Sequence, residues 1–326
     1  MSASDLTQIW DTEKLRDSKM NRIAYLTKKV QQKIQHILFA DSSEFIQIIN
    51  RRSVLARPAK IGFYLDNPLF IHLGDQLFFE PALRLTKNNF DTCIRPTPEM
   101  LEYFINSGAK VINDGEIFNC DIIVTREELL PDVLPRTKAN IIAINTLAND
   151  MCYRISESIT YSLANVFKIE IPENFDFAPW KPSVSQKRVA SEKVILAPFV
   201  NSGWFRVWES DVKRLSLQAK KCAEECGLSL CLVGGEADAE SKIPTVIGAD
   251  LEDWRGRFSP CQFAQILASG QIARVFTFDT FVFHAALAYG IPVTVKIRRS
   301  LPRRTRFIKE HFLPSYSSAN HKIDFL

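Results

Sequence analysis

Two separate runs of alternating strand-like and helix-like segments constrain the fold of this chain more than any other feature. In the first run, within residues 58–170, the predicted strands are residues 60–65, 92–95, 110–112, 121–124 and 140–144. The helices predicted between and after them are residues 74–87, 98–107 and 156–167. Strands that alternate with helices are typical of a parallel sheet covered on both faces. We therefore predict a doubly wound α/β domain over residues 58–170.

The same alternation returns after a break, and it predicts a second doubly wound domain over residues 193–326. Its predicted strands are residues 194–198, 228–233, 274–278 and 292–296, and its predicted helices are residues 209–226, 260–269 and 280–289. Residues 171–192 separate the two runs and contain Pro172, Pro179 and Pro182, as expected of an interdomain linker. Doubly wound sheets bind ligands at the carboxyl ends of their strands, so we expect the site in the cleft between the two domains.

Residues 1–57 precede both runs, and we predict that they form a helical arm. Ile23, Leu26, Val30 and Ile34 recur at helical spacing, and basic residues lie between them. Packing against the body or against a partner subunit explains this pattern. A basic amphipathic helix on anionic lipid is the alternative.

Composition narrows the class of protein and its location. A chain of 326 residues is long enough for two domains. The net charge of +4, from 41 basic and 37 acidic residues, favours an anionic ligand such as a nucleotide but lacks the dense basic stripe of a nucleic-acid-binding protein. The polar, acidic N-terminus is unlike a secretion signal, and every apolar run is too short to span a membrane. We therefore expect a cytoplasmic protein, with peripheral contact at the inner membrane as an alternative.

The seven cysteines indicate reduced thiols and no metal site. Their number is odd, and most lie in apolar segments. Cys222 and Cys226 stand one helical turn apart and could share a metal, but no CxxC pair or histidine cluster accompanies them. We predict core packing for these side chains and no metal or cofactor for the protein.

Asp75 is the first candidate for chemistry, because it lies where a helix is expected to begin, facing the predicted cleft. An alcohol becomes a good nucleophile when a positioned carboxylate accepts its proton. Helix capping is the alternative use of an aspartate at this place. Asp66 and His72 lie nearby on the same connection, and we consider them rival bases or acceptor-binding residues.

The segment that starts at Gly74-Asp75 and ends at Pro81-Ala82-Leu83 resembles a motif of the heptosyltransferase-like enzymes of glycosyltransferase family 9. In that family the motif reads Gly-Asp-x-x-x-x-x-Pro-Ala-Leu and opens the first helix. The resemblance implies a GT-B architecture of two Rossmann-like domains, with the acceptor on the first domain and the nucleotide sugar on the second. It also implies that Asp75 is the base that deprotonates the acceptor hydroxyl.

Two segments of the second half resemble loops of the same family. Arg206 and Trp208 match its Lys-x-Trp element, in which the basic residue contacts the donor diphosphate. Arginine can replace that lysine by binding phosphate through two nitrogens. The glycine pair before Glu236 and Asp238 resembles the family's strand-end loop, where an acid contacts the nucleotide. Ordinary core packing of Trp208 and a simple polar turn are the alternatives.

The segment from Asp279 to Ala288 carries the most specific resemblance in the second half. It follows the family motif Asp-Thr-Gly-x-x-His-x-Ala-Ala-Ala, with Asp279, Thr280 and His284 at matching positions. Free amides at the start of such a helix bind phosphate. Phe281 stands where the family has glycine, which allows a phosphate close to the backbone, so a blocked or re-aimed donor pocket is an alternative here. A helix capped by Asp279 is the alternative.

The resemblance predicts an inverting, metal-independent glycosyltransferase of bacterial surface-glycan or lipopolysaccharide synthesis. The expected donor is a nucleotide sugar, with ADP-heptose typical of the family, and the expected acceptor is a glycan or glycolipid. The expected donor-binding residues are Arg206, Trp208, Glu236, Asp279, Thr280, Phe281 and His284. The alternatives are a catalytically degenerate GT-B subunit and a nucleotide-sugar epimerase-type enzyme. We also expect the final stretch, after a basic tail, to return across the first domain.

Overall fold

The computed structural model describes residues 46–50, 60–67, 73–145, 155–183, 192–200, 208–241, 251–296 and 323–325. These residues form two sheets, which both lie within one compact unit, Phe45–Leu326. The helix predicted near the N-terminus, the basic tail, His72 and Arg206 lie outside the described residues. We call the part built on the first sheet the first lobe and the part built on the second sheet the second lobe.

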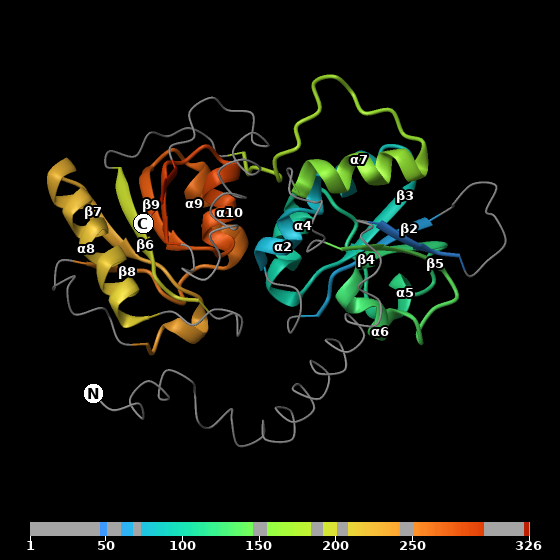
Figure 1. Ribbon diagram of the computed structural model, residues 1–326, viewed down its shortest axis with the longest axis horizontal. Coiled ribbons are helices and arrows are strands. Elements are labelled where there is room, and N and C mark those ends of the chain that lie inside the picture. The colour runs from blue at the N-terminus through green and yellow to red at the C-terminus, as the bar shows by residue number, and fades with distance from the viewer. Residues whose placement is uncertain are drawn as a thin grey trace, which may run out of the picture. The chain divides into compact units, whose positions relative to one another are not determined.

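The first sheet has five strands in the order β1-β5-β4-β2-β3. The strands are β1 (Ile46–Ile49), β2 (Lys60–Tyr64), β3 (Asp91–Arg95), β4 (Ile122–Arg126) and β5 (Asn140–Ile144). The α-helices are α2 (Leu73–Leu77), α3 (Glu80–Thr86), α4 (Leu101–Asn106), α5 (Asp114–Ile117), α6 (Leu130–Val133) and α7 (Ile155–Phe167), and the 3-10 helices are η2 (Pro98–Met100) and η3 (Glu127–Leu129). β2 to β5 pair in parallel, whereas β1 pairs antiparallel with β5. Figure 1 shows α7 on one face of this sheet and α5 and α6 on the other.

Three predicted elements of the first lobe differ from the structure. The single helix predicted over residues 74–87 is two helices, because Pro81 has no N–H to continue a helix and instead occupies the first turn of α3. The strand predicted at residues 110–112 is reduced to one bridge, between Val111 and Ile94. β1 lies inside the predicted helical arm but is an edge strand, as its isoleucines favour.

The second sheet has six strands, all parallel, in the order β11-β10-β9-β6-β7-β8. The strands are β6 (Lys193–Ala197), β7 (Ser229–Leu232), β8 (Glu252–Asp253), β9 (Ile272–Phe278), β10 (Val293–Lys296) and β11 (Ile323–Phe325). The helices are α8 (Glu209–Cys226), α9 (Pro260–Ala268), α10 (Phe281–Ala288) and the 3-10 helix η4 (Glu236–Asp238). β11 pairs with β10, so this last strand extends the second sheet and the expectation of a return across the first domain is wrong for it.

Helices cover both faces of the second sheet, as the alternation predicted. Leu215 and Ala219 of α8 pack with Val194, Leu196 and Leu232 in one buried cluster. α9 and α10 contribute to a second cluster on the other face, and that cluster continues into the first lobe. Figure 1 shows α8 on one side of the strands and α9 and α10 on the other. The prediction of two doubly wound sheets is confirmed.

The parallel strands bring the polar candidates to two edges, one in each lobe. β3 and β4 end at Arg95 and Arg126, and β9 and β10 end at Phe278 and Lys296. Because parallel strands point the same way, residues that follow them meet at one edge of each sheet. Residues 168–183, which we call the crossing segment, follow α7 and lead from the first lobe towards the second.

Candidate functional site

Asp75 lies in α2 and is held by an arginine that ends a neighbouring strand. Arg126 Nη1 lies 2.8 Å from Asp75 Oδ2, and Arg126 Nη2 lies 2.6 Å from Glu128 Oε1. The Arg126 side chain is buried, whereas a quarter of the Asp75 side chain is exposed, at 25%. The ion pair therefore fixes the direction of a carboxylate that solvent can still reach.

Arg126 stays charged in this buried place because it has two acidic partners. Burial lowers the pKa of its guanidinium, but Asp75 and Glu128 outweigh burial, and the net shift is upward. Arg126 is not among the site residues predicted from the sequence. The sequence does carry a signal for it, since Arg126 is the last residue of an otherwise largely apolar strand, β4, and so stands at the carboxyl edge, where ligand-binding side chains are expected.

The motif at the start of α10 forms a compact polar pair. His284 Nε2 lies 3.0 Å from Asp279 Oδ1, and both side chains are buried. Thr280 is the N-cap residue, without a side-chain capping bond, and its Oγ1 lies 3.2 Å from Thr277 Oγ1. Thr280, and not Asp279, is thus the N-cap residue of α10, and the Asp279 carboxylate pairs with His284.

α2 and α10 meet so closely that only glycine fits between them. A Cβ atom on Gly74 would stand 2.9 Å from His284 Cδ2 and 3.5 Å from both the backbone N and the Cα of Phe281. The rings of Phe78 and His284 also pack edge to face, 5.0 Å apart. The structure thus brings the two most specific motifs of the sequence, one from each lobe, into contact.

This contact changes the expected role of the α10 amides. The first helical residue is Phe281, and its backbone N lies against Gly74 of α2. α2 therefore lies beside the N–H that the resemblance assigns to the donor phosphate. The replacement of the family glycine by Phe281 therefore coincides with a helix start that packs on protein.

Asp238 closes the glycine loop, which comprises residues 234–238 and follows β7. Asp238 Oδ2 accepts a hydrogen bond of 2.7 Å from the Gly235 N–H, and Arg255 Nη1 donates one of 3.0 Å to the Asp238 carbonyl. Gly234 has no room for a side chain, because a Cβ would stand 2.7 Å from Asp238 Cβ. Asp238 is buried, whereas Glu236 is exposed. Of the two acids that the sequence left open, Glu236 is thus the one accessible to a ligand.

Trp208 is the N-cap residue of α8 and is 57% exposed. Core packing, the alternative considered for this side chain, is therefore wrong. Its expected partner Arg206 lies outside the described residues. An exposed indole before a helix start offers a flat apolar surface on which a sugar or a base can stack.

Asp66 belongs to a separate ion-pair network of the first lobe. Arg95 Nη2 lies 2.7 Å from Asp66 Oδ2, Arg95 Nε lies 3.2 Å from Asp114 Oδ1, and Arg136 pairs with Asp114 at 2.9 Å. Burial raises the pKa of the Asp66 carboxyl, and Arg95 opposes that shift. Asp66, the rival base, is thus bound to arginine in a cluster that does not include Asp75. Its neighbour His72 lies outside the described residues.

Two structural findings concern metals and membranes. Among the described residues, no three His, Cys, Asp or Glu side chains gather closely enough to bind a metal ion. Within the same part of the chain, no helix is both long and apolar enough to cross a bilayer.

The two doubly wound lobes define the GT-B class of fold. The structure is similar to a glycosyl transferase family 9 protein from Veillonella parvula, with TM-score 0.54 and 12% identity over 84% of this chain and 88% of that one. It is similar to E. coli heptosyltransferase WaaC with ADP-2-deoxy-2-fluoro heptose, with TM-score 0.55 and 14% identity over 81% of this chain and 92% of that one.

A third similar structure is E. coli ADP-heptose lps heptosyltransferase II, with TM-score 0.50 and 13% identity over 82% of this chain and 90% of that one. No protein-family model matches the chain, and no curated protein matches it in sequence. These likenesses establish the fold, and they confirm the resemblance in architecture to the heptosyltransferases of family 9.

Proposed function

We propose that this protein is an inverting glycosyltransferase that moves a sugar, a heptose or a related one, from a nucleotide-sugar donor to a bacterial surface-glycan or lipopolysaccharide acceptor. One observation carries the proposal: α2, which bears Asp75, contacts α10, which bears His284, the ion-pair partner of Asp279. A base for the acceptor and the predicted donor motif therefore lie on adjacent elements. The fold shared with heptosyltransferases supports the same reaction class.

The proposed step is a single displacement at the anomeric carbon of the donor sugar. Asp75 accepts the proton of the acceptor hydroxyl, and that oxygen forms a bond to the anomeric carbon. The bond from this carbon to the diphosphate oxygen breaks with its electron pair, and the nucleoside diphosphate leaves. Arg126 is a positioning residue that orients the Asp75 carboxylate. Attack from the face opposite the leaving group inverts the anomeric configuration.

In this proposal, residues of the second lobe bind the donor. Glu236 is exposed beside the glycine loop and can accept hydrogen bonds from ribose hydroxyls. Trp208 offers a stacking surface, and Arg206 is proposed to neutralise the diphosphate as charge develops on it. Because Phe281 packs on α2, donor binding is proposed to require that α10 and α2 separate. ADP-heptose is the first donor to test, since a similar structure contains an ADP-heptose analogue.

The first experiment measures nucleotide binding and transfer separately. Calorimetry and thermal shift against ADP-, UDP-, GDP- and CMP-sugars identify the donor class, because a bound ligand stabilises the fold. Asp75→Asn should leave donor affinity within about twofold and reduce transfer by roughly 10²- to 10⁴-fold. The matched control is Asp91→Asn, an exposed aspartate that pairs with Lys110 at the amino end of β3. Unchanged transfer in Asp75→Asn would remove Asp75 from the mechanism.

The contact between Phe281 and α2 favours one other function, a catalytically degenerate GT-B subunit that binds glycan or assembles with an active partner. In that case no nucleotide sugar should bind, and a glycan fragment should stabilise the protein on its own. The same binding screen therefore separates the two proposals.

A further inference from the structure

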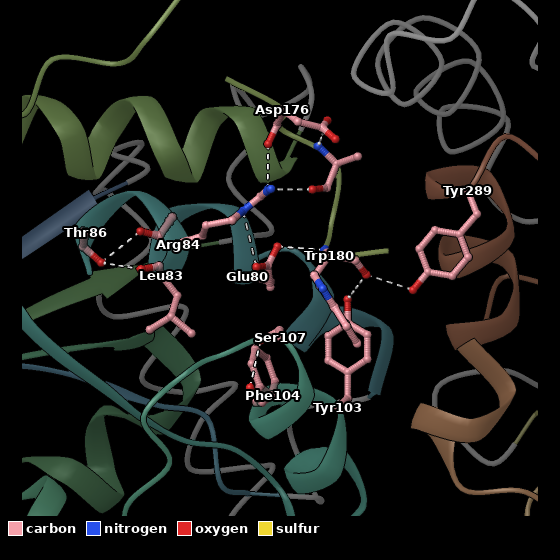
Figure 2. A network of polar contacts seen from close by, with 12 residues as sticks. Glu80, Leu83, Arg84, Thr86, Tyr103, Phe104, Ser107, Asp176, Trp180 and Tyr289 are labelled. Atoms are coloured by element: carbon pink, nitrogen blue, oxygen red, sulfur yellow. Dashed lines mark hydrogen bonds and ion pairs between the residues drawn. The ribbon is translucent and has the colours of Figure 1, made fainter. Parts of the chain in front are cut away.

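Trp180 of the crossing segment is held by side chains from both lobes. Tyr103 of α4 donates a hydrogen bond of 2.7 Å to the Trp180 carbonyl, and Tyr289, directly after α10, donates one of 3.0 Å to the same oxygen. Glu80 of α3 accepts a hydrogen bond of 2.8 Å from the Trp180 N–H. Figure 2 shows the two tyrosines approaching this peptide group from different elements. Both backbone groups of Trp180 are thus bound by side chains.

The residues before Trp180 are fixed to the first lobe by the same helix. Arg84 Nη2 donates to the carbonyls of Asp176 and Ala178, at 2.7 and 2.9 Å, and Arg84 Nε lies 3.4 Å from Glu80 Oε1. Glu80 and Arg84, one turn apart on α3, therefore hold residues 176–180 together (Figure 2). On the other side, Lys181 Nζ donates a hydrogen bond of 3.4 Å to the Tyr289 carbonyl in the second lobe.

We propose that the protonation state of Glu80 controls how firmly the crossing segment is held at Trp180, the residue on which both lobes converge. The Glu80 side chain is almost completely buried, at 2% relative exposure, under the chain that it binds. If the crossing segment lifts from α3, Glu80 meets water. The proton affinity of its carboxyl therefore differs between the held and the lifted states. The stability of the contact between Glu80 and the crossing segment thus depends on pH.

The charges around Glu80 determine the sign of this coupling. Burial raises the pKa of Glu80 to about 7, although Arg84, the Trp180 N–H and Lys87 oppose the shift. Asp176 adds to the rise, and Tyr103 and Tyr289, which face the same space, stay protonated because burial raises the pKa of each phenol. The held state favours the protonated carboxyl. In the lifted state the pKa returns towards the ordinary value of 4.5. The contact is therefore strongest at acidic pH and weakens as pH rises through about 7.

Hydrogen–deuterium exchange of the full chain without ligand tests this coupling, with intrinsic exchange rates corrected at each pH. In the wild type, protection of peptides that cover residues 176–183 should fall about tenfold from pH 6 to pH 8, as expected for one proton with a pKa near 7. Glu80→Gln keeps an oxygen that can accept from Trp180 but cannot ionise, so the fall should vanish. Glu173→Gln, an exposed glutamate of the same segment, should behave as the wild type.

A further variant distinguishes the effect of Glu80 ionisation from the loosening of the crossing segment that the loss of any contact would cause. Tyr289→Phe removes the second-lobe donor to Trp180 without touching Glu80. It should lower the protection of residues 176–183 at both pH values and keep the tenfold ratio. Wild-type protection that does not change with pH, or a change that persists in Glu80→Gln, would overturn the proposal. If Glu80→Gln does not fold, the wild-type profile still decides, because its fall in protection should level off above about pH 7. None of these measurements requires donor binding.

Discussion

Arg126 illustrates how one buried cation can determine the arrangement of two acidic side chains. Its guanidinium bridges Asp75 of α2 and Glu128 of η3, so the direction of the candidate base depends on a residue from another element. A guanidinium suits this role, because its planar set of donors binds two carboxylates at once. A lysine at the same position would offer one point of charge and would orient Asp75 less well.

Arg126→Met should lower the free energy of unfolding by about 3 kcal/mol, because it leaves two largely buried carboxylates without their cation. Urea denaturation measures this loss. The control is Arg136→Met, whose side chain is 42% exposed where it pairs with Asp114, and whose loss should cost less than about 1 kcal/mol. Equal losses in the two variants would mean that the ion pair with Asp75 contributes no more than a surface pair.

At the scale of elements, the contact between α2 and α10 relates the two sequence motifs to each other. Gly74 precedes the candidate base, and from the sequence alone this glycine has no role beyond its place in a motif. The structure gives it one, since any side chain here would meet His284. The same contact brings Phe281 against the first lobe. The residue that departs from the family motif is therefore also a residue that packs at this contact.

Gly74→Ala tests this packing. The added Cβ would stand 2.9 Å from His284 Cδ2, so one helix must shift, and we expect a loss of stability of about 1–3 kcal/mol. Gly115→Ala is the matched control, because Gly115 is also helical and its nearest neighbour would be 3.5 Å away. That change should be neutral or stabilise by up to about 1 kcal/mol. Thermal unfolding of both variants gives the comparison, and a fully stable Gly74→Ala would show that the helices do not pack this closely in solution.

At the scale of the whole molecule, the two lobes are joined by more than the covalent chain. Ser259 Oγ donates a hydrogen bond of 2.6 Å from the start of α9 to Glu102 of α4, and Tyr103 and Tyr289 share the carbonyl of Trp180. The buried core also continues from one lobe to the other. Ionisation of a single buried group at the crossing segment can therefore alter the stability of the whole unit.

The stability of the whole chain should accordingly depend on pH near neutrality. The folded-state pKa of Glu80, about 7, lies above its ordinary value of 4.5, so its stabilising contribution is complete below pH 4.5 and is lost as pH rises through 7. Relative to Glu80→Gln, the wild type should lose about 1 kcal/mol of unfolding free energy between pH 6 and pH 8. Chemical denaturation at the two pH values, with Glu173→Gln as control, measures the difference. A parallel pH dependence in wild type and Glu80→Gln would contradict it.

Much of the fold could be predicted from local sequence, because the signals for strands and helices act over short distances. The helix Glu209–Cys226 and the strand Asn140–Ile144 begin and end where their apolar patterns predicted. Hydrophobic alternation is a local signal, and so is a glycine that ends a helix, such as Gly227, whose φ lies in the left-handed region. Neither signal depends on contacts between residues that are distant in the sequence. The two doubly wound sheets follow from the order of these elements.

The sequence alone identified Asp75, Asp279 and His284 as candidates, because the two short segments that carry them resemble family motifs at the starts of helices. Only the tertiary structure decided their partners. Arg126 lies 51 positions from Asp75, and Glu80 is 100 positions from the N–H that it binds. No local pattern encodes such pairs, since they arise when strands distant in sequence are ordered side by side. The same packing determined which acid of the glycine loop is accessible, and it placed the start of α10 beside α2.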